Sequence, residues 1–232
     1  LLLNTDGVKV YSKLFGNLLC KPLKLPGSSS FALIVSALCG YPLGAKYSCD
    51  LYENKLITRD QWERLLNIAS NASPLFVIGT VGTNMLHSAE LGYLLFIANY
   101  LSCLVMGTLL PGRKSEQLPY LYRNEIKTAQ INFGAVLKES IENSVKSSLS
   151  IGGYITIFFV FIDIINNNII FNLFIGNLIS PKMRDLISGG ILGLIELTKG
   201  CYLISNSSGS AISKIAFIGF LLGFGGLSIA SQ

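Results

Sequence analysis

Apolar residues run along this chain in uncharged stretches that are separated by short polar segments. Residues without an acidic or basic side chain cover 65–89, 91–112, 147–162, 164–181, 200–213 and 215–232. A helix needs about 20 apolar residues to cross the hydrocarbon core of a bilayer. Some of these stretches reach that length and others fall short, and this mixture is typical of a membrane protein with re-entrant pieces. The pattern predicts an all-α, polytopic membrane protein.

Residues 30–46 hold the interruption around which the other elements are organised. The apolar run 31–39 is too short to span a bilayer and ends in the sequence GYPLG. Proline has no backbone N–H to donate and disfavours helical geometry at the residue before it, while glycine permits turns and close approach of backbones. A broken helix is tolerated at membrane depth only where protein buries it or where it lines a cavity.

The order of such elements divides the chain into two units. The predicted first repeat, residues 1–111, has an amphipathic helix at 8–24, the broken helix at 30–46, an interrupted span at 65–86 and a span at 91–110. A polar linker follows at 112–132. The predicted second repeat, residues 133–232, has an amphipathic helix at 133–149, spans within 151–179, a broken helix at 187–204 and a final span at 211–232. Between the first broken helix and the interrupted span, Thr58 is the expected N-cap of a short helix that begins at Arg59.

Two alignments of the chain with itself support a duplication. A shift of 160 residues lays 31–40 on 191–200, and a shift of 161 lays LNIASN (66–71) on LSIASQ (227–232), with four of six residues identical. Duplicated membrane units with broken helices at matching positions indicate a transporter whose binding site lies at the interface of the repeats. This hypothesis requires the breaks, expected at Pro42 and at Gly200, to face each other across a pocket.

The candidate binding residues are those nearest the breaks. They are Ser36, Gly40, Tyr41, Pro42, Gly44, Asn71, Ser73 and Pro74 in the first unit, and Glu196, Thr198, Lys199, Gly200, Ser228 and Gln232 in the second. Half-helix N-termini present free N–H groups and a positive dipole end, so a small anionic solute is the expected ligand.

Two ionisable candidates lie amid apolar sequence, where an unpaired charge is expensive. Glu196 is expected to take a coupling proton or sodium ion, and Lys199 to neutralise a ligand carboxylate. The alternative is that the two side chains pair one helical turn apart or reach an interface. Asp163 and His87 are interpreted as membrane-boundary residues.

Composition narrows the classes of function. Half of the 232 residues are apolar and 13% are charged, against about 25% in a soluble domain. The net charge of +5 comes from dispersed basic residues, which does not favour nucleic acid. The five cysteines form no CxxC pair and are expected to pack as small apolar residues. One histidine excludes a His-rich metal site, so neither a metal nor another cofactor is expected.

Motifs of catalysis and of export are absent from the sequence. It contains no HExxH or GxSxG, and GYPLGAK lacks the spacing of a phosphate-binding loop, so an enzyme is not expected. No signal peptide is visible at the start, and the chain stops inside an uncharged run. We therefore expect it to be an internal piece of a longer protein.

Several motifs resemble the YlbJ-type sporulation integral membrane proteins of endospore-forming bacteria, which carry the nucleoside-recognition Gate domain. The resemblance rests on KPLKLPGSSSFALIVSALCGYPLGAK (21–46), NASPLFVIGTVG (71–82), SLSIGGYITIFF (148–159), ELTKG (196–200) and GFGGLSIASQ (223–232). It implies Gate helices at 8–24 and 133–149 and an architecture similar to concentrative nucleoside transporters. It also implies a protein of the bacterial cell membrane or outer forespore membrane that moves dipicolinic acid for the spore cortex.

Other functions stay open at this point. A carrier of nucleosides and a non-transporting sporulation scaffold both fit the sequence. Membrane lipid, the solute and a coupling ion are the expected partners, and a homo-oligomer is left open. Membrane orientation cannot be read, because the polar segments show no clear asymmetry of basic residues.

Overall fold

The computed structural model describes residues 12–109, 133–168 and 180–232, and these ranges are helical without a β-strand. The predictions for 8–11, for the linker 112–132 and for 169–179 lie outside the described residues. The all-α class and the presence of membrane-spanning helices are confirmed for the described part.

The first half contains seven described helical elements. They are η1 (Gly16–Cys20), η2 (Gly27–Ser29), α2 (Ser30–Cys39), α3 (Leu43–Glu53), α4 (Arg59–Ile68), η3 (Leu75–Met85) and α5 (Ala89–Leu109). The expected cap of α4 is present: the Thr58 hydroxyl accepts a hydrogen bond from the Gln61 backbone, and the Gln61 side chain accepts one from the Thr58 backbone. This reciprocal capping box fixes where α4 begins.

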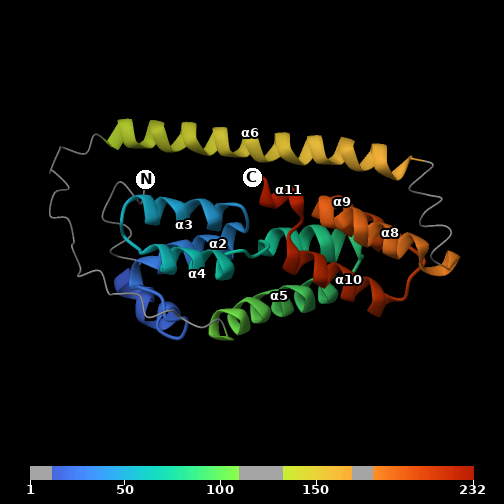
Figure 1. Ribbon diagram of the computed structural model, residues 1–232, viewed down its shortest axis with the longest axis horizontal. Coiled ribbons are helices and arrows are strands. Elements are labelled where there is room, and N and C mark those ends of the chain that lie inside the picture. Colours follow the sequence, from blue (N-terminus) through green and yellow to red (C-terminus); the bar gives the residue numbers. More distant parts are fainter. Residues whose placement is uncertain (1–11, 110–132, 169–179) are drawn as a thin grey trace.

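The second half begins with one long helix, α6 (Phe133–Asn166), which lies along one side of the other helices (Figure 1). The elements that follow are α8 (Pro181–Ile195), α9 (Leu197–Ser205), α10 (Ala211–Phe224) and α11 (Leu227–Ala230). The expectation of separate helices at 133–149 and from 151 onward was wrong. Gly152 and Gly153 continue the helix, because helical hydrogen bonds are local and no neighbour forces a turn there.

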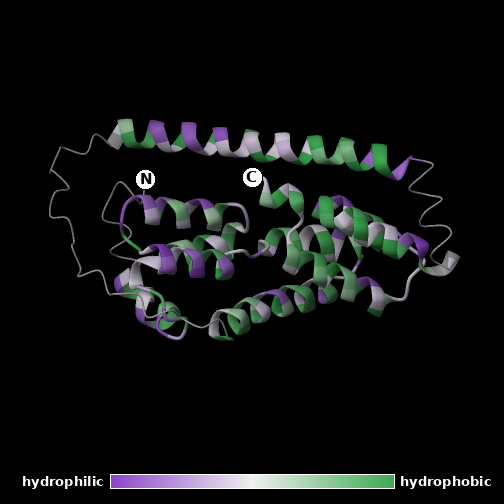
Figure 2. Ribbon diagram, viewed as in Figure 1, coloured by the Kyte–Doolittle hydropathy of each residue, from purple (hydrophilic) through white to green (hydrophobic). Residues whose placement is uncertain are grey.

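Within the part of the chain that the structure describes, three helical segments are long and apolar enough to cross a membrane: Ala89–Leu109, Gly134–Asn166 and Ala211–Ser231. Figure 2 shows the hydrophobic colour along α5 and along the second part of α6. Large apolar side chains of these three segments point outward. For example, Ile97 of α5 is 60% exposed and Ile212 in the Ala211–Ser231 segment is 81% exposed. Such exposure suits lipid rather than water. The apolar helices Gly27–Cys39 and Leu75–Met85 are too short to span.

Both expected breaks are present, although one is displaced. The helix α2 ends at Cys39, Gly40 follows with a φ of +77°, and α3 starts at Leu43 after Pro42. The second break was expected at Gly200 but lies at Glu196, which is extended with φ −139° and ψ 119° between α8 and α9. Gly200 is inside α9, where an added Cβ would collide with the Gly193 backbone.

Further interruptions separate α4 from η3 at 69–74 and α10 from α11 at Gly225 and Gly226. These glycines have φ values of +84° and +87°, which favour glycine over any other residue. In each half, a pair of helices joined by a break (α2–α3 and α8–α9) is followed by a second pair joined by an irregular segment (α4–η3 and α10–α11).

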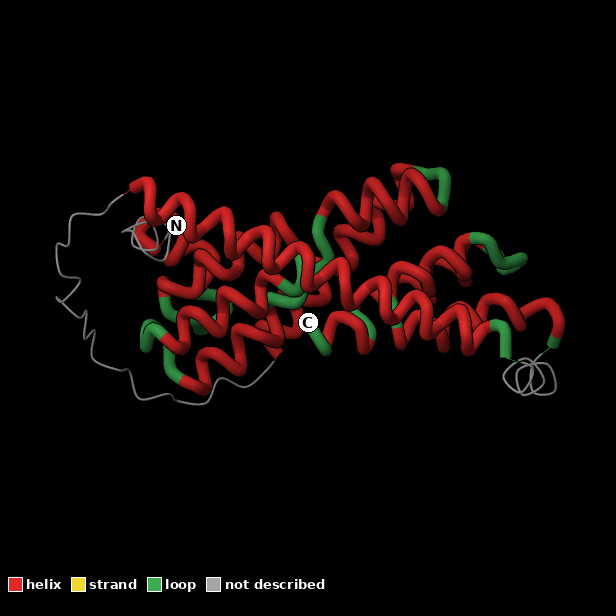
Figure 3. Tube along the Cα trace, turned by 90° about the horizontal axis from the view of Figure 1, so that it is seen from above, coloured by secondary structure: helices red, strands yellow, loops and turns green. Residues whose placement is uncertain are grey.

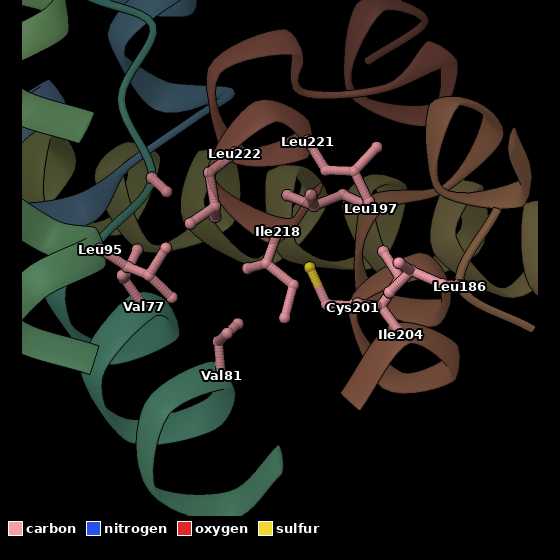
Figure 4. Close-up of a cluster of buried hydrophobic side chains, with 11 residues drawn as sticks. Val77, Val81, Leu95, Leu186, Leu197, Cys201, Ile204, Ile218, Leu221 and Leu222 are labelled. Carbon is pink, nitrogen blue, oxygen red and sulfur yellow. The ribbon is translucent and has the colours of Figure 1, made fainter. Parts of the chain in front are cut away.

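The larger apolar core joins the two halves. Ile218, Leu221 and Leu222 of α10 belong to the same buried cluster as Val77 of η3 and Leu95 of α5 (Figure 4). The cluster extends to α9 through other side chains, which are Leu197, Cys201 and Ile204. A second cluster packs the first half alone, around Phe31, Leu51 and Leu65. The shared cluster holds the two sets of interruptions next to each other.

Candidate functional site

A cavity of about 150 Å³ lies where the interruptions of the two halves meet. Its lining residues are Tyr41 from the α2–α3 break, Ser73 and Phe76 at the start of η3, Ile151 and Ile155 of α6, Glu196, Leu197 and Thr198 at the α8–α9 break, and Ser228, Ile229 and Gln232 at α11 and beyond. The two breaks do face a common space. Pro42 and Gly200, where the breaks were expected, are not among its lining residues, which come from Tyr41 beside the first break and Glu196 at the second.

The first break is held against the segment that precedes η3. The Tyr41 backbone N–H donates to the Asn71 carbonyl oxygen at 2.8 Å. A Cβ on Gly40 would come within 2.6 Å of the Ser73 backbone nitrogen, so only glycine fits at this crossing. This contact places the Tyr41 and Ser73 side chains on the same cavity.

Several other predicted site residues support this crossing without lining the cavity. The Ser36 hydroxyl donates to the Ala69 carbonyl at 2.8 Å, and Gly44 packs so closely that a Cβ would collide with that carbonyl. Asn71 is 6% exposed and donates from its side chain to the Ile68 carbonyl at 3.3 Å. The prolines, Pro42 and Pro74, immediately precede α3 and η3.

Glu196 begins α9 and points its carboxylate at the first turn of that helix. The residue is 2% exposed, and its carboxylate oxygens accept hydrogen bonds from the backbone N–H groups of Thr198 (3.0 Å) and Lys199 (2.7 Å). The positive end of α9 is thus occupied by a carboxylate of the protein itself. The sequence suggested that the N-terminus of α9 offers free N–H groups to an anionic solute. Glu196 already accepts hydrogen bonds from two of these groups.

Lys199 points away from the cavity toward α6. Its Nζ lies 3.0 Å from Asp163 Oδ1 and 5.4 Å from the centroid of the Phe159 ring. The Lys199 side chain thus pairs with Asp163, and its link to Glu196 runs through its backbone N–H. Asp163, interpreted from the sequence as a boundary residue, is a partner of a candidate site residue.

The remaining candidates divide between packing and lining. Gly200 closes α9 onto Gly193 of α8. Ser228 is 1% exposed, and its hydroxyl oxygen accepts a hydrogen bond from the Gln232 amide at 3.5 Å. Both Ser228 and Gln232 line the cavity, so the C-terminal end of the chain belongs to the site.

Sequence reasoning missed the apolar part of the lining, which is Phe76, Ile151, Ile155, Leu197 and Ile229. Apolar residues in apolar runs carry no chemical signal. Only the path of α6 across the bundle brings Ile151 and Ile155 to the cavity.

The lining combines hydrogen-bonding groups with apolar surface and one ionisable carboxyl group. Among the lining residues, Tyr41, Ser73, Thr198 and Ser228 carry hydroxyls and Gln232 carries an amide, and the Tyr41 hydroxyl is itself buried without a hydrogen-bond partner. Within the described ranges, no three His, Cys, Asp or Glu side chains gather as a metal site would require. This arrangement can bind a small polar solute with a flat apolar part.

These features define an α-helical integral membrane protein whose interrupted helices line a partly open pocket. The chain is 29% identical over 233 aligned positions to the Sporulation integral membrane protein YlbJ of Bacillus subtilis (strain 168), covering 90% of this chain and 57% of the relative. The similarity supports a YlbJ-type assignment, in agreement with the sequence motifs. No family model matches the chain, and no solved structure matches it.

Proposed function

We propose that this chain forms the solute-binding part of a membrane transporter that acts in sporulation. The observation that carries the proposal is the cavity at which the α2–α3 and α8–α9 breaks meet. Sites between broken helices near mid-membrane are the mark of secondary transporters. The name of the relative supplies the link to sporulation, and an outer forespore membrane location is part of the proposal.

The succession of elements supports a two-repeat architecture similar to concentrative nucleoside transporters. In each half, two helices joined by a break at the cavity precede a further interrupted segment: α2 and α3 precede α4 and η3, and α8 and α9 precede α10 and α11. The Gate helices of this proposal are residues 8–24 and 133–149, the latter forming the first part of α6.

The proposed solute is a small planar anion, with dipicolinic acid as the first compound to test. A pyridine ring suits the Tyr41 and Phe76 rings, and its carboxylates suit the hydroxyls and the Gln232 amide. Among the described residues that line the cavity, Glu196 is the only Asp, Glu, Lys or Arg, and Lys199 is engaged by Asp163. Two like unit charges 4 Å apart repel by about 4 kcal/mol at an effective dielectric constant of 20. The anion therefore enters together with a proton or sodium ion at Glu196.

Uptake by the full-length protein in proteoliposomes tests the solute. We expect labelled dipicolinate to accumulate, to depend on an imposed proton or sodium gradient, and to resist competition by nucleosides. If nucleosides competed for the site and dipicolinate had no effect, the proposed solute would be a nucleoside and not the dicarboxylate. Vesicles that accumulate neither solute would favour the scaffold.

Exchange of Glu196 for Gln separates a transporter from a scaffold. Glu196→Gln removes the charge but keeps an oxygen that can cap α9, so folding should persist while uptake falls at least about tenfold. The matched control is Glu63→Gln, which changes an exposed carboxylate of α4 that pairs with Arg59 at 2.9 Å. Normal sporulation with Glu196→Gln in place of the wild-type residue would contradict the transporter.

A further inference from the structure

Beside the fully buried Ile162, α6 meets the rest of the protein along a stripe on one face. The residues of this stripe recur every four positions: Ser147, Ile151, Ile155, Phe159 and Asp163. Side chains four residues apart lie on one face of a helix. Figure 3 shows α6 running across the other helices over most of the length of the molecule. The cavity lies under the middle of this stripe, where Ile151 and Ile155 line it.

Most of α6 outside the stripe is not embedded in the protein. Only 6% of its most apolar 18-residue window is buried. Leu149 and Ile157, which flank the lining residues, are 71% and 67% exposed. The helix therefore covers the cavity while leaving most of its surface free to face lipid.

The two ends of the stripe are held with different strength. Beyond the cavity, Asp163 pairs with Lys199 of α9 at 3.0 Å, and the neighbouring Ile162 is fully buried. Before the cavity, residues 141–150 are exposed except for the half-buried Ser147, whose Oγ accepts a hydrogen bond from Lys46 Nζ of α3 at 2.6 Å. The part of α6 that precedes the cavity is thus the more easily released.

Two glycines lie between the two attachments. Gly152 and Gly153 are helical and exposed, and an added Cβ would meet nothing within 4 Å. Packing therefore does not require glycine at either position, although glycine in a helix is less favourable than alanine. Glycine pairs are among the places where helices bend.

We propose that α6 is the moving wall of the cavity: it bends at Gly152 and Gly153, and the part before them swings away from α3 to admit the solute. The part after them stays anchored through Asp163 and Ile162. The Lys46–Ser147 hydrogen bond holds the wall closed. This inference rests on the proposed function, since it assigns the entrance to the same cavity.

Labelling of a cysteine in the cavity measures opening directly. In full-length protein carrying Thr198→Cys, the rate at which a small maleimide modifies residue 198 is followed by mass spectrometry. Ser147→Ala and Lys46→Met should each raise this rate about fivefold, the factor expected from one lost hydrogen bond. The matched control is Ser144→Ala. The Ser144 hydroxyl, like that of Ser147, donates to a backbone carbonyl one turn earlier in α6.

Stiffening the proposed hinge should have the opposite effect. The double exchange of Gly152 and Gly153 for Ala should slow labelling at least about threefold, because alanine favours the straight helix. Its control is Gly223→Ala, a glycine of α10 that also has open space around it. Equal labelling rates in the Ser147, Gly152/Gly153 and control variants would overturn the moving wall. Labelling needs no transported solute, so failed uptake with responsive labelling would instead reject the proposed function.

Discussion

At the scale of single residues, Thr58 and Glu196 each cap a helix by accepting backbone hydrogen bonds, but only Thr58 has a sequence signature. Thr58, followed three positions later by Gln61, is a recognisable capping pair, and it caps α4 as expected. Glu196 caps α9 from inside an apolar run, where glutamate is not a usual cap. Its carboxylate had been predicted to be functional, but the local role that places it at the cavity was not foreseen.

Arg64 gives a residue-scale prediction for stability. This arginine is 9% exposed and donates to the carbonyls of Leu23 and Gly107, which joins α4 to the chain before α2 and to the end of α5. Arg64→Met leaves both carbonyls without this donor and should reduce the free energy of unfolding by about 3 kcal/mol. Thermal unfolding of the purified protein in detergent measures the change.

The control for this experiment is Arg59→Met on the same helix. Arg59 is exposed and pairs with Glu63 one turn away. Exposed pairs contribute little because water and salt screen them, so no resolved shift in Tm is expected. Equal shifts for Arg59→Met and Arg64→Met would show that the buried contacts of Arg64 do not stabilise the fold.

At the scale of helices, close glycine contacts decide which elements pack as pairs. Gly200 of α9 faces Gly193 of α8 with no room for a side chain, so the two helices of the second broken pair approach backbone to backbone. The sequence pointed to Gly200 as the site of the break. In the structure Gly200 packs α9 against α8. The break falls at Glu196, whose side chain caps the first turn of α9.

Substitution of Gly200 tests this packing. Gly200→Ala should separate α8 from α9 and lower the Tm by several degrees, because its Cβ would collide with backbone that cannot rotate away. Gly223→Ala in α10 meets no atom within 4 Å and should leave the Tm unchanged or raise it slightly. If Gly200→Ala were as stable as Gly223→Ala, the close approach of α8 and α9 would be wrong.

At the scale of the whole molecule, α5, α6 and the α10–α11 segment carry the apolar surface that lipid must cover. The short apolar helices Gly27–Cys39 and Leu75–Met85 lie among them with buried residues such as Phe31 and Val77. This distribution is that of a protein that spans the bilayer and shelters its broken helices inside.

Extraction of membranes at high pH tests this whole-molecule arrangement. We expect the full-length protein to stay in the membrane pellet after alkaline carbonate treatment and to be released only by detergent, because the exposed apolar side chains lose their lipid contacts otherwise. Immunoblots of pellet and supernatant measure the partition. Release by carbonate alone would mean that the apolar helices do not span the bilayer.

The sequence by itself determined the helical class, the apolar spans, the α4 cap and the break between Cys39 and Leu43. Each of these depends on local properties: the length of an apolar run, a capping pair, or a proline beside a glycine. The same local signals placed Tyr41, Ser73, Glu196, Thr198, Ser228 and Gln232 near breaks, and all of these line the cavity.

Only the tertiary structure decided which of the candidates line that cavity and what closes it. Ile151 and Ile155 are ordinary apolar residues until α6 crosses the bundle, and Lys46 meets Ser147 across 101 positions of chain. Lys199 lies three residues after Glu196 in the sequence, but the fold pairs its side chain with Asp163 of α6. Contacts between distant segments depend on how helices pack, which no local pattern of residues specifies.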